Sequence, residues 1–166
     1  NNATYELLQK SGIPVLFNGG WTEKTPLGKA EWIKFFGVLL NKQKRAEQLF
    51  NEIEADYKKI KELAVQASKK PTVLSGALYK DIWYLPAGES WAAQFITDAN
   101  AHYLWSDTKG TGSLSLSLES VLEKGQAAEF WISPSQFKGY EEMSTSNTHY
   151  KEFIAFKNQN IHTFSN

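Results

Sequence analysis

The chain has 166 residues, of which 42% are apolar and 22% charged, and these fractions are typical of a folded globular domain rather than a disordered chain or a coiled coil. Eighteen Lys and Arg residues balance eighteen Asp and Glu residues without a basic cluster, so we expect no nucleic-acid partner. The absence of cysteine excludes disulfides, thiolate metal sites and thiol nucleophiles.

Neither end of the chain has the pattern of an export or membrane segment. No apolar run approaches the roughly 20 residues that span a bilayer, and the first 17 residues lack the basic and apolar regions of a signal peptide. The chain begins with Asn1 and ends in a polar stretch at Asn166. We expect both ends to lie within a longer protein.

The first elements in chain order are a strand and a helix start. Residues 13–17 (IPVLF) are rich in β-formers and are followed by the turn residues Asn18, Gly19 and Gly20, which predicts a short strand that ends in a loop. Thr25 followed by Pro26 predicts a helix N-terminus, because Thr caps free N–H groups and Pro is tolerated at the first helical position.

A long helical region follows, over residues 26–68. Apolar residues surround most of the circumference up to Leu40, which indicates burial on more than one side. After Asn41 the apolar residues fall on one face: Ala46, Leu49, Phe50, Ile53, Tyr57, Ile60 and Ala64. A continuous helix of about 40 residues would be roughly 60 Å long. A bend or a break of this helix at Asn41 remains an open alternative.

The remaining segments alternate between strands and helices. We predict strands at 72–78, 83–86, 129–132 and 161–164, and helices at 91–99, 117–124 and 150–156. The segment 106–113 reads as a loop, and 136–150 has no clear pattern. Ser90 is the expected N-cap of the helix at 91–99, and Asn100 the left-handed residue after it. Alternation of this kind predicts an α/β fold with a mostly parallel sheet covered on both faces.

Three segments, in this order, resemble the binding proteins of vitamin B12 and iron-siderophore ABC importers. They are the helical segment that starts PLGKAEWIKFF at 26, WYLPAGES with TDANAHYLW at 83–105, and SLSLSLESVLEKGQAAEFWI at 113–132. Asn100 stands where the family usually has Gly, and Ala128 and Glu129 stand where many members have Pro and Asp before the strand.

The resemblance implies a domain organisation. Residues 1–25 would be the end of a first lobe, 26–70 the long interlobe backbone helix, and 71–166 a C-terminal Rossmann-like lobe with three layers that lacks its last helix. It also implies an extracytoplasmic monomer, anchored to the membrane by a lipid at an N-terminus that precedes this chain. Its partner would be an ABC permease.

Glu119 is the candidate for contact with that permease. A carboxylate in the first turn of a helix is also explained by the helix dipole alone, which stabilises it by about 0.3–1 kcal/mol. The resemblance implies a docking role instead, because the family's glutamate at this position pairs with an arginine of the permease.

The ligand would be an iron-siderophore, haem or a cobalamin, and its contacts should come from loops at the carboxyl ends of the strands. Aromatic side chains suit a large, flat or amphipathic ligand. The candidates are Trp21, Glu23, Trp83, Tyr84, Trp105 and Ser113. Burial in the core is an equal alternative for Trp83 and Tyr84, and we expect Trp131, inside a strand, to be a core residue.

The charges near these candidates favour a neutral or weakly charged ligand. Arg45 lies on the polar face of the long helix, and Lys24, Lys80 and Lys109 are the cations of the candidate loops. The three histidines lack metal-ligand spacing, and Met143 stands alone in a polar stretch, so we expect no bound metal or cofactor.

We expect no catalysis, because the sequence has no intact nucleophile elbow, P-loop or dinucleotide fingerprint and no paired carboxylates in a cleft loop, and the glycines of GTGSLS at 110–115 lack dinucleotide-loop spacing. Two alternatives remain open. The first is a non-catalytic α/β domain that binds another protein or acts as a sensor. The second is a Rossmann-like enzyme that lacks its catalytic half.

Overall fold

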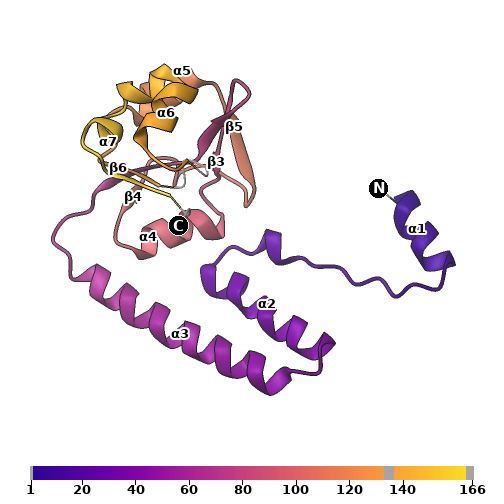
Figure 1. The fold of residues 1–166 in the computed structure, drawn as a ribbon. Coiled ribbons are helices and arrows are strands. Elements are labelled where there is room, and N and C mark those ends of the chain that lie inside the picture. The colour runs from indigo at the N-terminus through magenta and orange to yellow at the C-terminus, as the bar shows by residue number, and fades with distance from the viewer. Residues whose placement is uncertain (1, 133–136, 164–166) are drawn as a thin grey trace.

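A computed structural model describes residues 2–132 and 137–163. Figure 1 shows an α/β lobe, a hairpin of two helices beside it, and an N-terminal segment that leads away from both. This segment carries α1 (Asn2–Lys10) and the short 3-10 helix η1 (Gly20–Thr22). The hairpin consists of α2 (Pro26–Leu39) and α3 (Gln43–Val65).

The helical region breaks near Asn41 into α2 and α3. Of the alternatives left open by the sequence, the single continuous helix over residues 26–68 is therefore wrong. Thr25 caps α2 as predicted by accepting a hydrogen bond from the Gly28 N–H, with Pro26 at the first position. Asn41 has a φ of 53°, and the chain then reverses. A side chain on Gly37 would overlap Ala46, so this glycine permits the close packing of α2 on α3. The 23 residues of α3 span roughly 35 Å.

The central sheet is parallel, as the alternation of elements predicted. Its strand order is β4-β1-β6-β7, and all neighbouring pairs are parallel. Helix α4 lies on one side of this sheet, and α5, α6 and α7 lie on the other (Figure 1). The strands and helices of the lobe are β1 (Thr72–Ser75), β4 (His102–Tyr103), β6 (Phe130–Ile132), β7 (Ile161–His162), α4 (Trp91–Asp98), α5 (Leu118–Gly125), α6 (Tyr140–Ser146), η2 (Thr148–Glu152) and α7 (Ile154–Lys157).

A second, antiparallel sheet was not predicted. It contains β2 (Ala77–Tyr79), β3 (Ile82–Pro86) and β5 (Ser113–Leu116) in the order β2-β3-β5. The single strand expected at 72–78 is divided at Gly76, which has a φ of 86° and where a side chain would overlap the Tyr84 carbonyl oxygen. The chain therefore turns from one sheet into the other at this glycine.

Other corrections concern the N-terminal segment, α6 and the last strand. Residues 13–17 form no strand, because no described strand pairs with them. Helices α1 and α6 lie where no element was assigned. The last predicted strand is paired at Ile161–His162, and its expected end at residue 164 lies outside the described residues.

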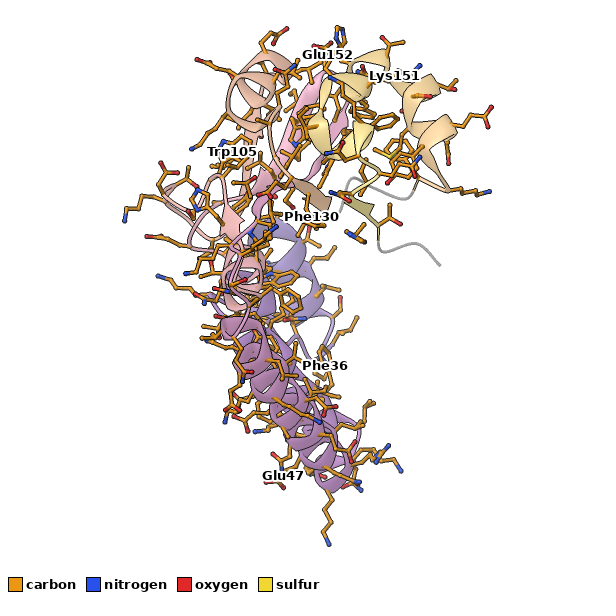
Figure 2. All side chains as sticks on the ribbon, turned by 90° about the vertical axis from the view of Figure 1, so that its left-hand side faces the viewer. Phe36, Glu47, Trp105, Phe130, Lys151 and Glu152 are labelled. Carbon is orange, nitrogen blue, oxygen red and sulfur yellow. The ribbon has the colours of Figure 1, made fainter. Side chains whose placement is uncertain are left out.

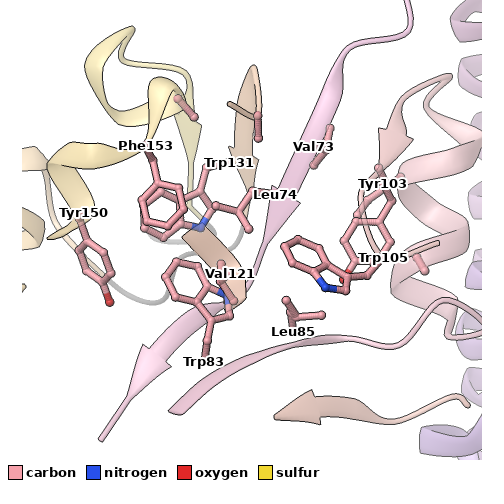
Figure 3. Packing of buried hydrophobic residues seen from close by; sticks show 14 of the residues in the cluster. Val73, Leu74, Trp83, Leu85, Tyr103, Trp105, Val121, Trp131, Tyr150 and Phe153 are labelled. Atoms are coloured by element: carbon pink, nitrogen blue, oxygen red, sulfur yellow. The ribbon is translucent and has the colours of Figure 1, made fainter. Parts of the chain in front are cut away.

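The core of the lobe is aromatic (Figure 3). Trp83 and Trp131 are fully buried, with ring centroids 5.2 Å apart, and Phe153 packs against both. Both indole N–H groups donate to carbonyls at the end of β1: Trp83 to Ser75 at 3.0 Å and Trp131 to Gly76 at 2.8 Å. These bonds satisfy polar groups that burial would otherwise leave unpaired, and they fix the corner between the two sheets.

Candidate functional site

A pocket of about 740 Å³ lies where the lobe meets the start of the helical hairpin. Its walls come from the end of β1, from β3, from the first turns of α4 and from residues 111–113, with one side chain each from η1 and α2. The residues that line it are Trp21, Lys29, Ser75, Gly76, Tyr84, Leu85, Pro86, Ser90, Trp91, Ala92, Phe95, Ile96, Thr111, Gly112, Ser113 and Ile132.

The start of α4 is fixed by a buried serine. The Ser90 hydroxyl donates to the Ala87 carbonyl at 2.6 Å and accepts from the Ala93 N–H at 3.2 Å, which confirms its predicted N-cap role. Trp91 follows immediately and therefore sits at the first turn of the helix, against the pocket.

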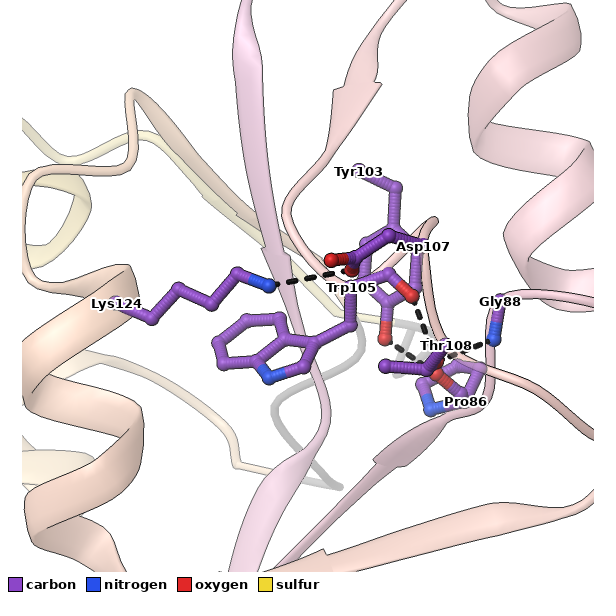
Figure 4. A network of polar contacts seen from close by, with 7 residues as sticks. All are labelled: Pro86, Gly88, Tyr103, Trp105, Asp107, Thr108 and Lys124. Atoms are coloured by element: carbon purple, nitrogen blue, oxygen red, sulfur yellow. Dashed lines mark hydrogen bonds and ion pairs between the residues drawn. The ribbon is translucent and has the colours of Figure 1, made fainter.

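The turn between β3 and α4 is held by Tyr103 and Thr108 (Figure 4). The Tyr103 hydroxyl donates to the Pro86 carbonyl at 2.6 Å. Burial raises the pKa of Tyr103, so this hydroxyl remains a protonated donor. Thr108 Oγ1 accepts from the Gly88 N–H and donates to the Trp105 carbonyl, both at 2.8 Å. These contacts hold the turn that leads from β3 into α4 beside the pocket.

The segment 110–113 is tied to the same turn by backbone hydrogen bonds. The Ala87 N–H donates to the Gly112 carbonyl at 2.9 Å, and the Gly110 N–H donates to the Glu89 carboxylate at 2.9 Å. This backbone bond and an ion pair with Lys109 hold the pKa of Glu89 below its usual range. The Glu89 carboxylate is therefore already engaged by contacts within this loop.

Four aromatic side chains form the exposed part of the pocket. Trp21 is 68% exposed, Phe95 52% and Tyr84 39%, and Trp91 is half-buried. The accessible rings, together with the aliphatic side chains behind them, provide a large apolar surface with a few polar edges. Such a surface suits a flat or amphipathic small molecule.

Three of the six predicted ligand contacts lie together in this pocket: Trp21, Tyr84 and Ser113. Trp83 is fully buried and Trp105 is 5% exposed, so both are core residues and the predicted ligand contact is corrected for each. Glu23 lies outside the pocket lining, and its carboxylate accepts a hydrogen bond from Trp32 Nε1 at 2.9 Å.

Sequence reasoning missed Lys29, Trp91 and Phe95. Phe95 is exposed on α4, whereas its neighbour Ile96 is buried. The sequence did contain a signal for Trp91 and Phe95. Because Ser90 is the N-cap, the helix begins at Trp91, and residues 91 and 95, four apart, lie on the same face of it. Lys29 comes from a different part of the chain and had no such signal.

Glu119 is exposed in the first turn of α5, which lies on the side of the sheet away from α4 (Figure 1). Ser117 caps this helix by accepting a hydrogen bond from the Ser120 N–H. The Glu119 backbone N–H and the Ser117 hydroxyl hold the pKa of Glu119 below its ordinary value. The carboxylate is therefore charged at neutral pH.

The described part of the chain contains no group of three or more His, Cys, Asp or Glu side chains that would hold a metal ion. Within residues 2–132 and 137–163, no helix has both the length and the apolar character needed to cross a membrane.

The chain is similar to a known protein family and to solved structures of binding proteins. A family profile with the description "periplasmic binding protein" matches residues 1–164. An uncharacterized lipoprotein of Methanocaldococcus jannaschii is 30% identical over 154 residues. The alignment covers 90% of this chain and 36% of that protein, so the chain spans much less than its relative's full length.

Two solved structures share the fold at 17% identity each. The periplasmic haem-binding protein RhuT from Roseiflexus sp. RS-1, in its apo form, has a TM-score of 0.75, with 98% of this chain and 62% of that chain covered. An ABC-type Fe3+-hydroxamate transport system from Saccharomonospora viridis has a TM-score of 0.74, with 97% and 57% covered. At such identities the likeness establishes the fold.

Proposed function

Because this chain belongs to the periplasmic binding protein family, we propose that it is the ligand-capturing half of an extracytoplasmic protein that delivers an iron-siderophore, haem or a cobalamin-type ligand to an ABC permease. The observation that carries the proposal is the pre-formed pocket, with its accessible aromatic side chains at the junction of lobe and hairpin. Iron-siderophores, haem and cobalamins all present extended organic surfaces around their metal, and aromatic rings bind such surfaces at little cost in conformational entropy.

The names of the structural neighbours support the same ligand class. One is a haem-binding protein and the other belongs to a hydroxamate transport system, so two kinds of iron chelate occur on this fold. The pocket has an open side, because Trp21 at its wall is 68% exposed. In the full-length binding protein that we propose, a second lobe would close over this opening, and the helical hairpin would connect the two lobes. Capture would then need only small movements of two rigid bodies.

Docking on the permease is the second part of the proposal. Glu119 lies on the opposite side of the sheet from α4 and its pocket, so a permease at α5 would leave the pocket free. The related lipoprotein supports attachment of the full-length protein to a membrane by a lipid. A monomer would suffice for both roles.

The experiment is an isothermal titration of the full-length protein with haem, a panel of ferric hydroxamates and cobalamin. We expect saturable binding of at least one of these at micromolar concentration or below. Trp91→Ala should weaken that binding by at least about ten-fold, because truncation of a central aromatic contact commonly costs more than 1 kcal/mol.

Tyr79→Ala is the matched control, because Tyr79 is an exposed aromatic residue outside the pocket. It should bind as the wild type does. Absence of saturable binding to every compound would refute the proposed ligand class, and a complex with another protein would instead support an interaction domain.

A further inference from the structure

Lys29 is the one charged residue among those that line the pocket within the described part of the chain. It projects from the first turn of α2, and its ammonium lies 5.8 Å from the centre of the Trp91 ring. The cation therefore stands at the edge of the aromatic surface on which the proposed ligand would rest.

The charge of Lys29 is not neutralised by the described residues around it. Its ammonium donates to the Gly20 carbonyl at 3.0 Å, and no described carboxylate forms an ion pair with it. Carboxylates close in sequence to the pocket lining are engaged elsewhere: Glu23 by Trp32, Glu31 by Lys34, and Glu89 by Gly110 and Lys109. One N–H of the ammonium is used, which leaves two donors for another acceptor.

We infer that Lys29 is the specificity-determining residue of the pocket, and that it selects ligands with an acidic group at the edge of a flat or amphipathic body. The apolar body would lie on Trp91, Tyr84 and Phe95, and a carboxylate or another oxyanion at its rim would accept hydrogen bonds from the ammonium. Charge-assisted hydrogen bonds of this kind are about twice as strong as neutral ones. A neutral ligand of the same shape would leave the cation unpaired.

This inference rests on the proposed function and narrows it, and it replaces the neutral or weakly charged ligand expected before Lys29 was placed in the pocket lining. A competing role for Lys29 is purely structural, because its bond to Gly20 also holds the turn that carries Trp21. The two roles differ in their consequences. Loss of a structural lysine would weaken every ligand equally, whereas loss of a selecting lysine would weaken only the acidic ones.

The test uses the full-length protein and pairs of probes that share one ring system and differ in the charge of their side groups. One pair is ferric protoporphyrin IX and its dimethyl ester, and the other is a cobalamin monocarboxylic acid and cobalamin itself. Each is titrated against the wild type, Lys29→Gln, Lys29→Arg and Lys44→Gln. Lys44 is the control, because it is exposed on α3 and outside this pocket. Circular dichroism and thermal melting of each variant verify the fold.

We expect the wild type to bind the acidic member of its preferred pair at least about ten-fold more tightly than the neutral member. Lys29→Gln should abolish this preference and change the affinity for the neutral member by no more than about two-fold. Lys29→Arg should retain the preference, and Lys44→Gln should match the wild type.

Equal affinity of the wild type for both members would overturn the inference, as would an equal loss of both in Lys29→Gln, and either result would leave the proposed function intact. If the wild type binds no member of either pair but binds a neutral ferric hydroxamate, the inference alone fails. If it binds none of the chelates, the proposed function fails and this inference fails with it.

Discussion

Among single residues, Glu119 is the one on which the proposed docking depends. Its carboxylate is exposed and charged, because the N-terminus of α5 and the Ser117 hydroxyl lower its pKa. Glu119→Lys reverses this charge at a site remote from the pocket. We expect uptake of the ligand by cells to fall to background, while titration of the purified variant gives the wild-type affinity.

Glu123→Lys provides the control for this prediction, because Glu123 is exposed on the same helix. Its uptake should remain close to that of the wild type. Normal uptake by the Glu119 variant would remove the docking role, and equal loss in both variants would indicate a general effect of charge on this face.

Trp83 and Tyr84 show why residue-level prediction reached only part of the site. Neighbouring residues on a strand point to opposite faces of the sheet, so one of these two side chains must point into the core and the other away from it. The sequence does not say which face of an isolated strand is buried. In the structure Trp83 is fully buried and Tyr84 is 39% exposed at the pocket. The sequence therefore predicted that the site is aromatic, but not which of these two side chains faces the pocket.

Among the elements, α3 and α4 are joined by a polar contact centred on Asp98. Its carboxylate accepts hydrogen bonds from the Tyr57 hydroxyl at 2.7 Å and from Gln94 Nε2 at 2.6 Å, and pairs with Lys61 at 2.9 Å. Burial acts to raise the pKa of Asp98, but these three partners together bring it below the ordinary value. The contact fixes the hairpin against the lobe, and hence the side of the pocket that α2 supplies.

The lowered pKa of Asp98 gives a pH dependence of known sign. A carboxylate with a lowered pKa in the folded state stabilises the fold above its ordinary pKa of about 3.9, and this stabilisation is lost as the pH falls through the folded-state value. Asp98→Asn should lower the free energy of unfolding by about 1 kcal/mol at pH 7 and by less near pH 3. Urea unfolding at a series of pH values measures both.

Asp56→Asn is the control, because Asp56 is exposed on α3. Its unfolding free energy should follow the wild-type pH profile. A constant difference between Asp98→Asn and the wild type from pH 3 to pH 7 would contradict the assigned role of the carboxylate.

The prediction of elements succeeded where the signal is local. Thr25 and Ser90 cap helices as predicted, and Asn100 has a φ of 57°. The antiparallel sheet was missed because β5 pairs with a strand about 30 residues away, and nothing in the polar alternation of SLSL marks that partner. The turn at Gly76 was missed for a similar reason, because the close approach to Tyr84 is a tertiary contact.

At the scale of the whole molecule, the pocket exists only because distant segments meet. Lys29 of the hairpin and Trp91 of α4 are separated by about 60 residues of chain, and β3, residues 111–113 and single residues from other elements also line the walls. Figure 2 shows the hairpin extending away from the lobe, with Glu47 near its far tip and Lys151 and Glu152 at the opposite end of the molecule. The order of strands and helices predicted the lobe, but the position of the hairpin against it came from tertiary contacts such as that of Asp98 with Tyr57.

The most direct test of the central claim, that this pocket is the ligand site, is hydrogen–deuterium exchange of the full-length protein with and without the chelate that it binds. We predict slower exchange on binding in residues 84–96 and 110–113 and in the turn at 19–22, with no change in α5. Slower exchange confined to α5 or to other regions outside the pocket walls would contradict the claim.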